Sequence, residues 1–268
     1  RLSFFVFATT MLVWIFGADH APTFDEVTRF FFMSLGQALV AAGLVWLLYI
    51  ALEPYVRRRW PDTIVTWTRV LDGSVRDPLV GRDVLIAIVV AVFLSLVDLF
   101  QNLVLFQIGA APQDSLSSLD AWLGIRQLFA TGVLSKMNAA IGISLLLFFL
   151  IFLLRVVTRR QWLTTLLFVL IFTAMNVLGE TDPLLMTPFQ ILTHGLTVIV
   201  ILRFGLLTMT TAIFVSALLG SVPITTDFSA WYGGYTIAVL VAVLALAGWA
   251  FHTSLGGQKL FAGGLLDE

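Results

Sequence analysis

The side chains best suited to chemistry lie within segments of the chain that are otherwise apolar. Asp98, Gln101 and Asn102 have i, i+3 and i+4 spacing, which places them on one face of a helix. Gln190 and His194 form a second pair, with i, i+4 spacing. Because ionisable groups at membrane depth are costly, these residues are candidates for a site that binds a small ligand or moves a proton.

A third polar group lies at the outer end of another apolar segment, at Asn176, Glu180 and Asp182. One arrangement would join Asp98, Glu180 and His194 in a metal or proton site. The other uses all of these groups as hydrogen bonds between helices. The sequence favours the second arrangement, because it has no His-Glu-x-x-His pair and no second carboxylate at matched spacing. We therefore expect no catalytic residue, no metal ligand and no cofactor in this segment.

The composition indicates what kind of structure must position these residues. The chain is 59% hydrophobic and 12% charged, and its mean hydropathy is +1.00. Soluble domains carry about 25% charged residues. The sequence therefore predicts an all-α fold, a polytopic helical transmembrane bundle, in an integral membrane protein.

The apolar runs predict about eight spans in a single domain of residues 1–268, since about 20 apolar residues cross the hydrocarbon layer. The expected spans are residues 2–17, 30–52, 84–108, 138–157, 162–179, 188–202, 205–222 and 231–253. The run Pro188–Val222 is too long for one crossing, so we divide it at Arg203-Phe204-Gly205. The competing interpretation keeps one tilted helix with Arg203 buried.

The longest polar interruption is Glu53–Asp83, which holds six of the fifteen basic residues of the chain. Such clusters remain on the cytoplasmic side of a membrane. Eight spans with both ends in the cytoplasm leave only Arg29, Arg126 and Lys136 of the fifteen basic residues outside. The sequence thus predicts a cytoplasmic arginine-rich loop at residues 53–83 and cytoplasmic termini.

Part of this loop, Pro61–Gly73, has apolar residues at helical spacing and predicts an amphipathic helix on the inner leaflet, with a solvated connector as the alternative. Ser118–Phe129 is a candidate for a second interfacial helix. The expected partners are the bilayer and its anionic headgroups rather than nucleic acid. The residues expected to contact the membrane surface are Arg57, Arg58, Arg59, Trp60, Trp67 and Arg69.

Three stretches carry a resemblance: ALEPYVRRRWP at Ala51–Pro61, RDPLVGRDVL at Arg76–Leu85 and TSLGGQKLF at Thr253–Phe261. They resemble the C-terminal multi-span membrane domain of certain bacterial membrane-bound serine/threonine protein kinases, over nearly the whole chain. The resemblance implies a cytoplasmic kinase domain upstream of Arg1, which would bind ATP and Mg²⁺. The absence of an initiator Met fits a fragment of such a protein.

This segment itself has no phosphate-binding loop and no His-Arg-Asp or Asp-Phe-Gly triplet, so we expect no phosphoryl transfer within it. The expected function is membrane anchor and sensor of a receptor-like kinase in the bacterial inner membrane. The alternative is a small transporter or permease subunit with a polar site around Asp98 and His194. A weaker option is an intramembrane enzyme that uses Glu180, Asp182 and His194. The sequence does not indicate an oligomeric state.

Overall fold

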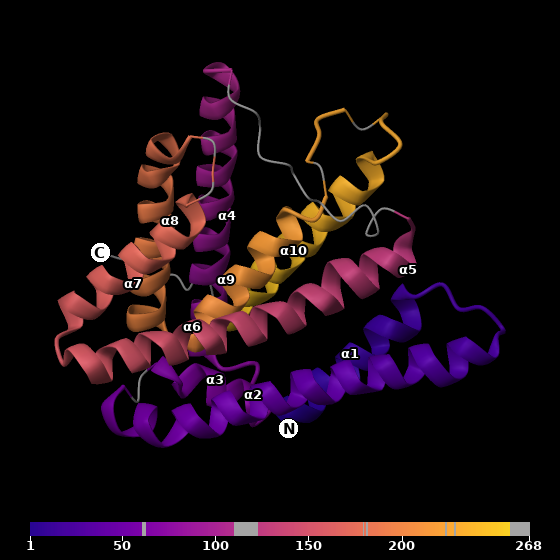
Figure 1. Cartoon of the computed structure of the whole chain (residues 1–268), viewed down its shortest axis with the longest axis horizontal. Helices are drawn as coiled ribbons and strands as arrows, with labels where there is room; N and C mark the ends of the chain where they lie inside the picture. The colour runs from indigo at the N-terminus through magenta and orange to yellow at the C-terminus, as the bar shows by residue number, and fades with distance from the viewer. Residues whose placement is uncertain are drawn as a thin grey trace, which may run out of the picture.

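The structure, a computed structural model, describes residues 1–60, 63–109, 123–178, 180, 182–222, 224–227 and 229–257, without the side chains of residues 26, 27 and 57–59. Every regular element in these ranges is a helix (Figure 1). The all-α fold predicted from the sequence is therefore confirmed.

Eight apolar helices make up most of the molecule. They are α1 (Leu2–Gly17), α2 (Phe31–Arg59), α4 (Pro78–Gln107), α6 (Lys136–Thr158), α7 (Gln161–Val177), α8 (Pro183–Phe204), α9 (Leu206–Leu219) and α10 (Gly233–Ser254). Four short elements complete the fold: η1 (Glu26–Phe30), α3 (Val65–Leu71), α5 (Ile125–Gln127) and η4 (Leu128–Ser135). Each of the eight predicted spans overlaps one of these helices, with different bounds in several cases.

Five helices are long and apolar enough to cross a membrane, among the residues that the structure describes. They are Thr28–Val56, Pro78–Gln107, Ile125–Thr158, Pro183–Phe204 and Gly233–Ser254. α1, α7 and α9 are shorter. The 14 residues of α9 extend only about 21 Å, less than the roughly 30 Å of a hydrocarbon core.

α9 is the centre of the packing. It lies against α4 and α6 most extensively and also contacts α8, α10 and α3. Most of its side chains are buried, including Leu206, Met209, Ala212 and Val215. A short helix enclosed by longer ones has most of its surface covered by protein, so its length is matched to its neighbours rather than to lipid.

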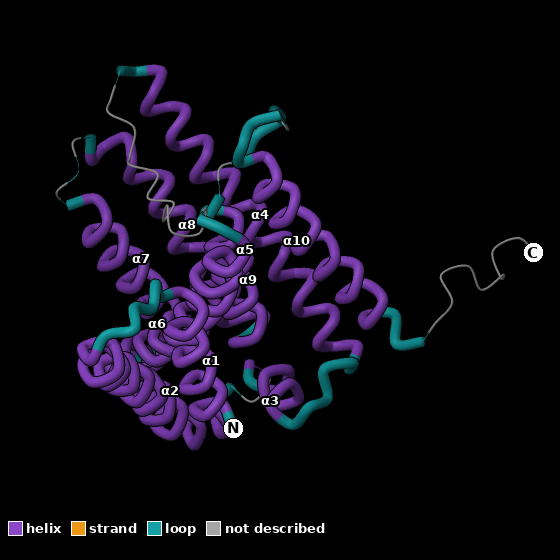
Figure 2. Tube along the Cα trace, turned by 90° about the vertical axis from the view of Figure 1, so that its right-hand side faces the viewer, coloured by secondary structure: helices purple, strands orange, loops and turns teal. Residues whose placement is uncertain are grey.

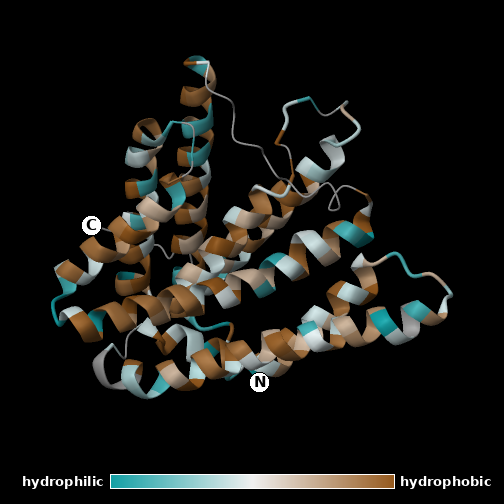
Figure 3. Ribbon diagram, in the orientation of Figure 1, coloured by the Kyte–Doolittle hydropathy of each residue, from teal (hydrophilic) through white to brown (hydrophobic). Residues whose placement is uncertain are grey.

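The helices do not form a bundle of parallel rods. In Figure 1, α4 and α8 stand upright while α2 and α6 lie across the view; in Figure 2, α6 and α2 are seen nearly end-on. Apolar residues predominate along both sets of helices (Figure 3), and many of their side chains are exposed. On α4, for example, Val89 is 70% exposed and Phe106 is 69% exposed. Such an exterior suits lipid contact and indicates an integral membrane protein.

The division expected at Arg203-Phe204-Gly205 is confirmed as a break in the helix, and the break lies at Gly205. Gly205 has φ +90°, a left-handed conformation that side chains with a Cβ rarely adopt. Its backbone also lies so close to residue 63 that an added Cβ would be 2.2 Å from the carbonyl oxygen of Thr63. Both features require glycine at this position, and α8 therefore ends at Phe204.

The bounds of the loop expected at residues 53–83 are wrong at both ends. α2 continues through Pro54 to Arg59, and α4 already begins at Pro78. Burial of Leu52 and Val56 on either side of the proline offsets the hydrogen bond that Pro54 cannot donate. At the other end, Asp77 caps α4, and Pro78 at the first helical position needs no donor. The arginine stretch, as we call Glu53–Asp83, is thus largely helical.

Two other helix starts were placed too late. Ile125–Thr158 is one continuous run of 34 residues, so α5 and η4 extend the span predicted at residues 138–157. A separate interfacial helix was expected at Ser118–Phe129, but residues 125–129 belong to this run. Residues 118–122 lie outside the described residues. α8 begins at Pro183 rather than residue 188, with Asp182 at the N-cap position.

Candidate functional site

The polar residues predicted from the sequence lie on three adjacent helices, α4, α7 and α8, except for Glu180, which follows the end of α7. α7 packs against α8, and α8 packs against α4. The rings of Phe100 and Phe189 join α4 to α8, with centroids 6.0 Å apart. Leu105, Val177 and Met186 form a small apolar cluster with one member on each helix.

The three polar residues of α4 do not share one environment. The side chain of Gln101 is buried, whereas Asp98 is exposed on the outer surface. The Asn102 amide donates to the Asp98 carbonyl oxygen of its own helix, at 3.0 Å. The Asn102 Oδ1 atom is buried without a hydrogen-bond partner. This face of α4 therefore turns from lipid-exposed to protein-covered within one turn.

The polar residues of α7 and α8 also make local contacts. Nδ1 of His194 lies 3.5 Å from the Thr173 hydroxyl, and the histidine ring lies against Phe172, with centroids 5.7 Å apart. The Asn176 amide donates to the carbonyl oxygen of Phe172 on its own helix, at 2.9 Å. One of these hydrogen bonds joins two helices and the other lies within one helix, as expected for polar residues that support helix packing in a membrane.

Glu180 and Gln190 are half-buried. The backbone N–H of Glu180 donates to Val177 and extends the end of α7. Within the described part of the chain, no three His, Cys, Asp or Glu residues are grouped closely enough to hold a metal ion.

The arginine stretch brings together parts of the chain that are far apart in sequence. Arg1 donates from Nη1 to the carbonyl oxygen of Leu71 at the end of α3, at 3.2 Å. Gly256, after the end of α10, lies so close to Pro78 that an added Cβ would be 3.0 Å from the proline Cγ. Both described ends of the chain therefore contact this stretch.

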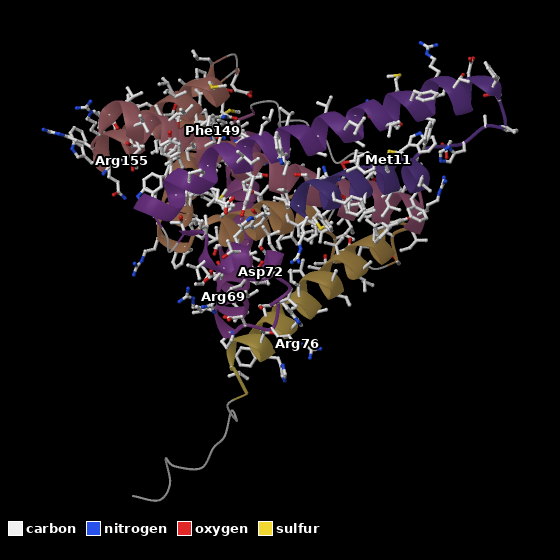
Figure 4. The ribbon with its side chains drawn as sticks, turned by 90° about the horizontal axis from the view of Figure 1, so that it is seen from below. Met11, Arg69, Asp72, Arg76, Phe149 and Arg155 are labelled. Atoms are coloured by element: carbon white, nitrogen blue, oxygen red, sulfur yellow. The ribbon has the colours of Figure 1, made fainter. Side chains whose placement is uncertain are left out.

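Other helix ends meet at the same place. The ring of Tyr55 at the end of α2 lies 5.1 Å from that of Phe152 near the end of α6. The Gly205 break lies against Thr63, as described above. At Gly81, in the first turns of α4, an added Cβ would be 2.5 Å from the backbone nitrogen of Ser254 at the end of α10. Figure 4 shows Arg69, Asp72 and Arg76 gathered beside these helix ends.

No known protein family, curated protein or solved structure matches the chain.

Not all of the residues expected at the membrane surface face outward. Trp67 is only 4% exposed and packs into the main apolar core, together with Ile64. The expectation that Trp67 contacts headgroups is therefore wrong, because the apolar face of α3 packs on α4 and α9 instead of lipid. The helix is also shorter than Pro61–Gly73, and its predicted start at Pro61 and Asp62 lies outside the described residues.

Trp60 is half-buried, and its ring lies 6.2 Å from that of Phe148. Arg69 is 37% exposed and forms an ion pair with Asp77. The side chains of Arg57, Arg58 and Arg59 lie outside the described part of the structure.

Sequence reasoning missed the residues at which helices approach most closely. Gly81 has no polar group and no apolar periodicity to mark it. The only feature of the sequence that could have indicated this close approach is a small residue one turn after the N-cap of a helix. Thr63 contributes its backbone rather than its side chain to the Gly205 contact, so its residue type carries no signal.

Proposed function

We propose that this chain is the membrane domain of a bacterial serine/threonine protein kinase, which anchors a cytoplasmic kinase domain and passes a signal to it through the arginine stretch. The proposal includes eight crossings, with α1, α7 and α9 as short spans, and both ends of the domain in the cytoplasm.

One observation carries the topology in this proposal: alternate helix ends gather at the most basic part of the chain. The kinase part rests on the three stretches that carry the resemblance. The start of α1 and the ends of α2, α6, α8 and α10 contact or adjoin the arginine stretch. At the opposite ends, Arg126 donates to the carboxylate of Asp19, at 3.0 Å, and so joins the turn after α1 to the start of α5. When a chain crosses a membrane repeatedly, successive helix ends lie on opposite sides, so the ends separate into two groups. The group that lies at the basic residues belongs on the cytoplasmic side.

The same contacts offer a route for a signal. Gln190 and His194 lie near the middle of α8, and the helix runs from them to the Gly205–Thr63 contact. Thr63 is followed directly by α3, whose end binds Arg1. A shift of α8 would therefore move the backbone of Gly205 against that of Thr63. The movement would pass through α3 to Arg1, where a preceding kinase domain would join.

The topology can be tested directly because the chain has no cysteine. Two exposed positions suit single cysteine substitutions. They are Ser74, in the arginine stretch, and Ser229, between α9 and α10. We expect a membrane-impermeant maleimide to label Ser74→Cys only in inside-out vesicles and Ser229→Cys only in right-side-out vesicles. Labelling of both from the same side would overturn the eight-crossing topology.

The kinase assignment has its own test. The coding sequence upstream of Arg1 should encode a glycine-rich loop, a His-Arg-Asp and an Asp-Phe-Gly triplet in that order. The full-length protein in nanodiscs should then transfer phosphate from ATP with Mg²⁺ to a serine-containing test peptide. An upstream sequence without these motifs would refute the proposal whatever the topology.

A further inference from the structure

Three arginines gather at the turn between α6 and α7, which we call the α6–α7 turn. Arg155 is in the last turn of α6, Arg159 follows the last residue of that helix, and Arg160 precedes the first residue of α7. Arg159 and Arg160 are exposed, and Arg155 is half-buried. In Figure 4, Arg155 lies apart from Arg69 and Arg76. None of the three was among the residues expected at the membrane surface.

Hydrogen bonds fix the backbone of the α6–α7 turn. The backbone N–H of Arg159, a residue with φ +57°, donates to the Arg155 carbonyl oxygen, at 3.0 Å. The hydroxyls of Thr158 and Thr164 are 2.7 Å apart, and the Thr164 hydroxyl donates to the Arg160 carbonyl oxygen, at 3.0 Å. The three arginines are therefore attached to one preorganised segment, which lowers the entropy cost of binding a common ligand.

The positive charge of this turn is not balanced by the protein. None of the three guanidinium groups forms a hydrogen bond or ion pair with a residue in the described part of the chain, and Nη1 of Arg155 is buried without an acceptor. α6 and α7 contain no Asp or Glu. At the adjoining end of α2, residues 57–59, whose side chains are not described, are all arginines and supply no carboxylate. Such a cluster of like charges favours an anion between them.

Apolar surface continues from the turn along both helices. On α7, Trp162, Leu166 and Leu170 have i, i+4 and i+8 spacing and are all exposed, with Trp162 at 62%. On α6, Leu153 and Val157 are exposed, with Val157 at 79%. A tryptophan beside basic residues at the end of an apolar surface is typical of headgroup depth. The anion that fits this turn therefore carries acyl chains, which lie along α6 and α7.

We propose that the α6–α7 turn binds a phospholipid that carries two phosphates, as cardiolipin does, with the phosphates among Arg155, Arg159 and Arg160. A guanidinium donates paired hydrogen bonds to a phosphate, and basic pockets between transmembrane helices bind such headgroups. The single phosphate of phosphatidylglycerol contacts fewer of the three arginines at once, and phosphatidylcholine adds an ammonium of like charge. This inference rests on the membrane location of α6 and α7 and not on the kinase assignment.

The test is a lipid titration of the delipidated full-length protein in a nonionic detergent, followed by native mass spectrometry. Tetraoleoyl cardiolipin, dioleoyl phosphatidylglycerol and dioleoyl phosphatidylcholine are compared at equal phosphate. We expect cardiolipin to bind about fivefold more tightly than phosphatidylglycerol, the gain from one further arginine contact, and phosphatidylcholine to bind most weakly. Equal affinity for cardiolipin and phosphatidylglycerol, or a preference for phosphatidylcholine, would overturn the proposal.

Substitution of the two exposed arginines tests their assignment. Arg159→Gln combined with Arg160→Gln leaves only Arg155, so cardiolipin should bind about 25-fold more weakly and lose its preference over phosphatidylglycerol. Arg159→Lys combined with Arg160→Lys keeps the charge and should retain most of the affinity. A folded glutamine double variant that keeps the wild-type preference for cardiolipin would refute the assignment of these arginines.

Arg29→Gln combined with Arg76→Gln is the matched control, because it removes the same charge at two exposed positions outside the α6–α7 turn. The control should leave the affinity and the preference for cardiolipin unchanged. An equal loss in the control would show that the attraction is diffuse and would overturn the proposal of a discrete site. Thermal unfolding of each variant shows whether it folds.

Discussion

Arg69 and Asp77 join α3 to the first turn of α4 through one carboxylate. Oδ2 of Asp77 pairs with the Arg69 guanidinium, while Oδ1 accepts from the backbone N–H of Leu79, at 2.9 Å. The same side chain therefore caps α4 and holds α3 against it. This arrangement fixes the arginine stretch relative to the helix that carries Asp98.

The two roles of Asp77 can be separated by substitution. Asp77→Asn keeps a good N-cap and removes the ion pair, so it should destabilise the protein by only about 0.5 kcal/mol, because the pair is partly exposed to solvent. Asp77→Ala removes both roles and should cost about 1–2 kcal/mol. Reversible unfolding in mixed detergent micelles measures both values.

Arg69→Met completes a double-mutant cycle. The double variant Arg69→Met, Asp77→Asn should lose no more stability than either single variant, because each single change already breaks the ion pair. Equal destabilisation by Asn and Ala at position 77 would contradict the capping role.

The turn between α9 and α10 carries a carboxylate whose titration is shifted. Oδ1 of Asp227 accepts from the hydroxyl of Ser229, at 2.6 Å, and from its backbone N–H, at 3.0 Å. The side-chain hydrogen bond and then the backbone hydrogen bond from Ser229 lower the pKa of Asp227 below its ordinary value. Its contribution to stability is therefore present above the ordinary pKa of an aspartate and is lost as pH falls through the lowered value.

The measurement is an NMR titration of protein labelled with ¹³C-aspartate, with Asp227→Asn to assign the resonance. We expect Asp227 to titrate below its ordinary pKa and Ser229→Ala to raise its pKa toward that value. Thr225→Val is the control: the Thr225 hydroxyl accepts from the Asp227 backbone and not from its carboxylate. An unchanged titration in Ser229→Ala would contradict the assigned cause.

Composition and apolar run length were sufficient to predict the helical class and all eight apolar helices, and the run length placed the break between α8 and α9 within Arg203-Phe204-Gly205. Helix starts were less predictable. The second span was expected to end at Leu52, where the polar stretch begins, yet Leu52 and Val56 are buried on either side of Pro54 and the helix continues. Tertiary packing outweighed the local preference of proline there.

The polar residues were harder to interpret, because spacing shows which residues share a helix face but not what covers that face. Asp98 and Gln101 have helical spacing, but α8 covers only part of α4 and leaves Asp98 outside. Trp67 shows the opposite case: it was expected at the membrane surface but is buried in the protein core. From the sequence alone, an apolar helix face next to arginines is compatible with either environment. Only the fold decides between them.

A buried hydroxyl pair joins the central helix to α6. The hydroxyls of Ser144 and Thr210 are 2.6 Å apart, and Ser144 is fully buried. Thr210→Val replaces the hydroxyl with a methyl group of similar size, so it should cost about 0.6 kcal/mol, the average for hydrogen bonds between membrane helices, and no more than about 1.7 kcal/mol. Thr210→Ser keeps the hydroxyl and should retain the Ser144 contact. A cost as large for Thr210→Ser as for Thr210→Val would show that packing, not the hydrogen bond, matters here.

The Gly205–Thr63 contact gives the sharpest prediction for the fold. Gly205→Ala would strain a backbone with φ +90° and place a methyl group 2.2 Å from the Thr63 carbonyl oxygen, and neither backbone can yield without moving α8 or α3. The strained backbone conformation alone costs about 1–3 kcal/mol, and the steric clash adds to it. We therefore expect a strongly lowered midpoint of thermal unfolding in detergent, or no folded protein. Gly43→Ala is the matched control, because nothing lies within 4 Å of an added Cβ at that site in α2, and alanine should be neutral or stabilise the helix by about 0.5–1 kcal/mol. If Gly205→Ala unfolds at the same temperature as Gly43→Ala, the α8–α9 break does not rest on Thr63, and the proposed route from α8 to α3 is lost with it.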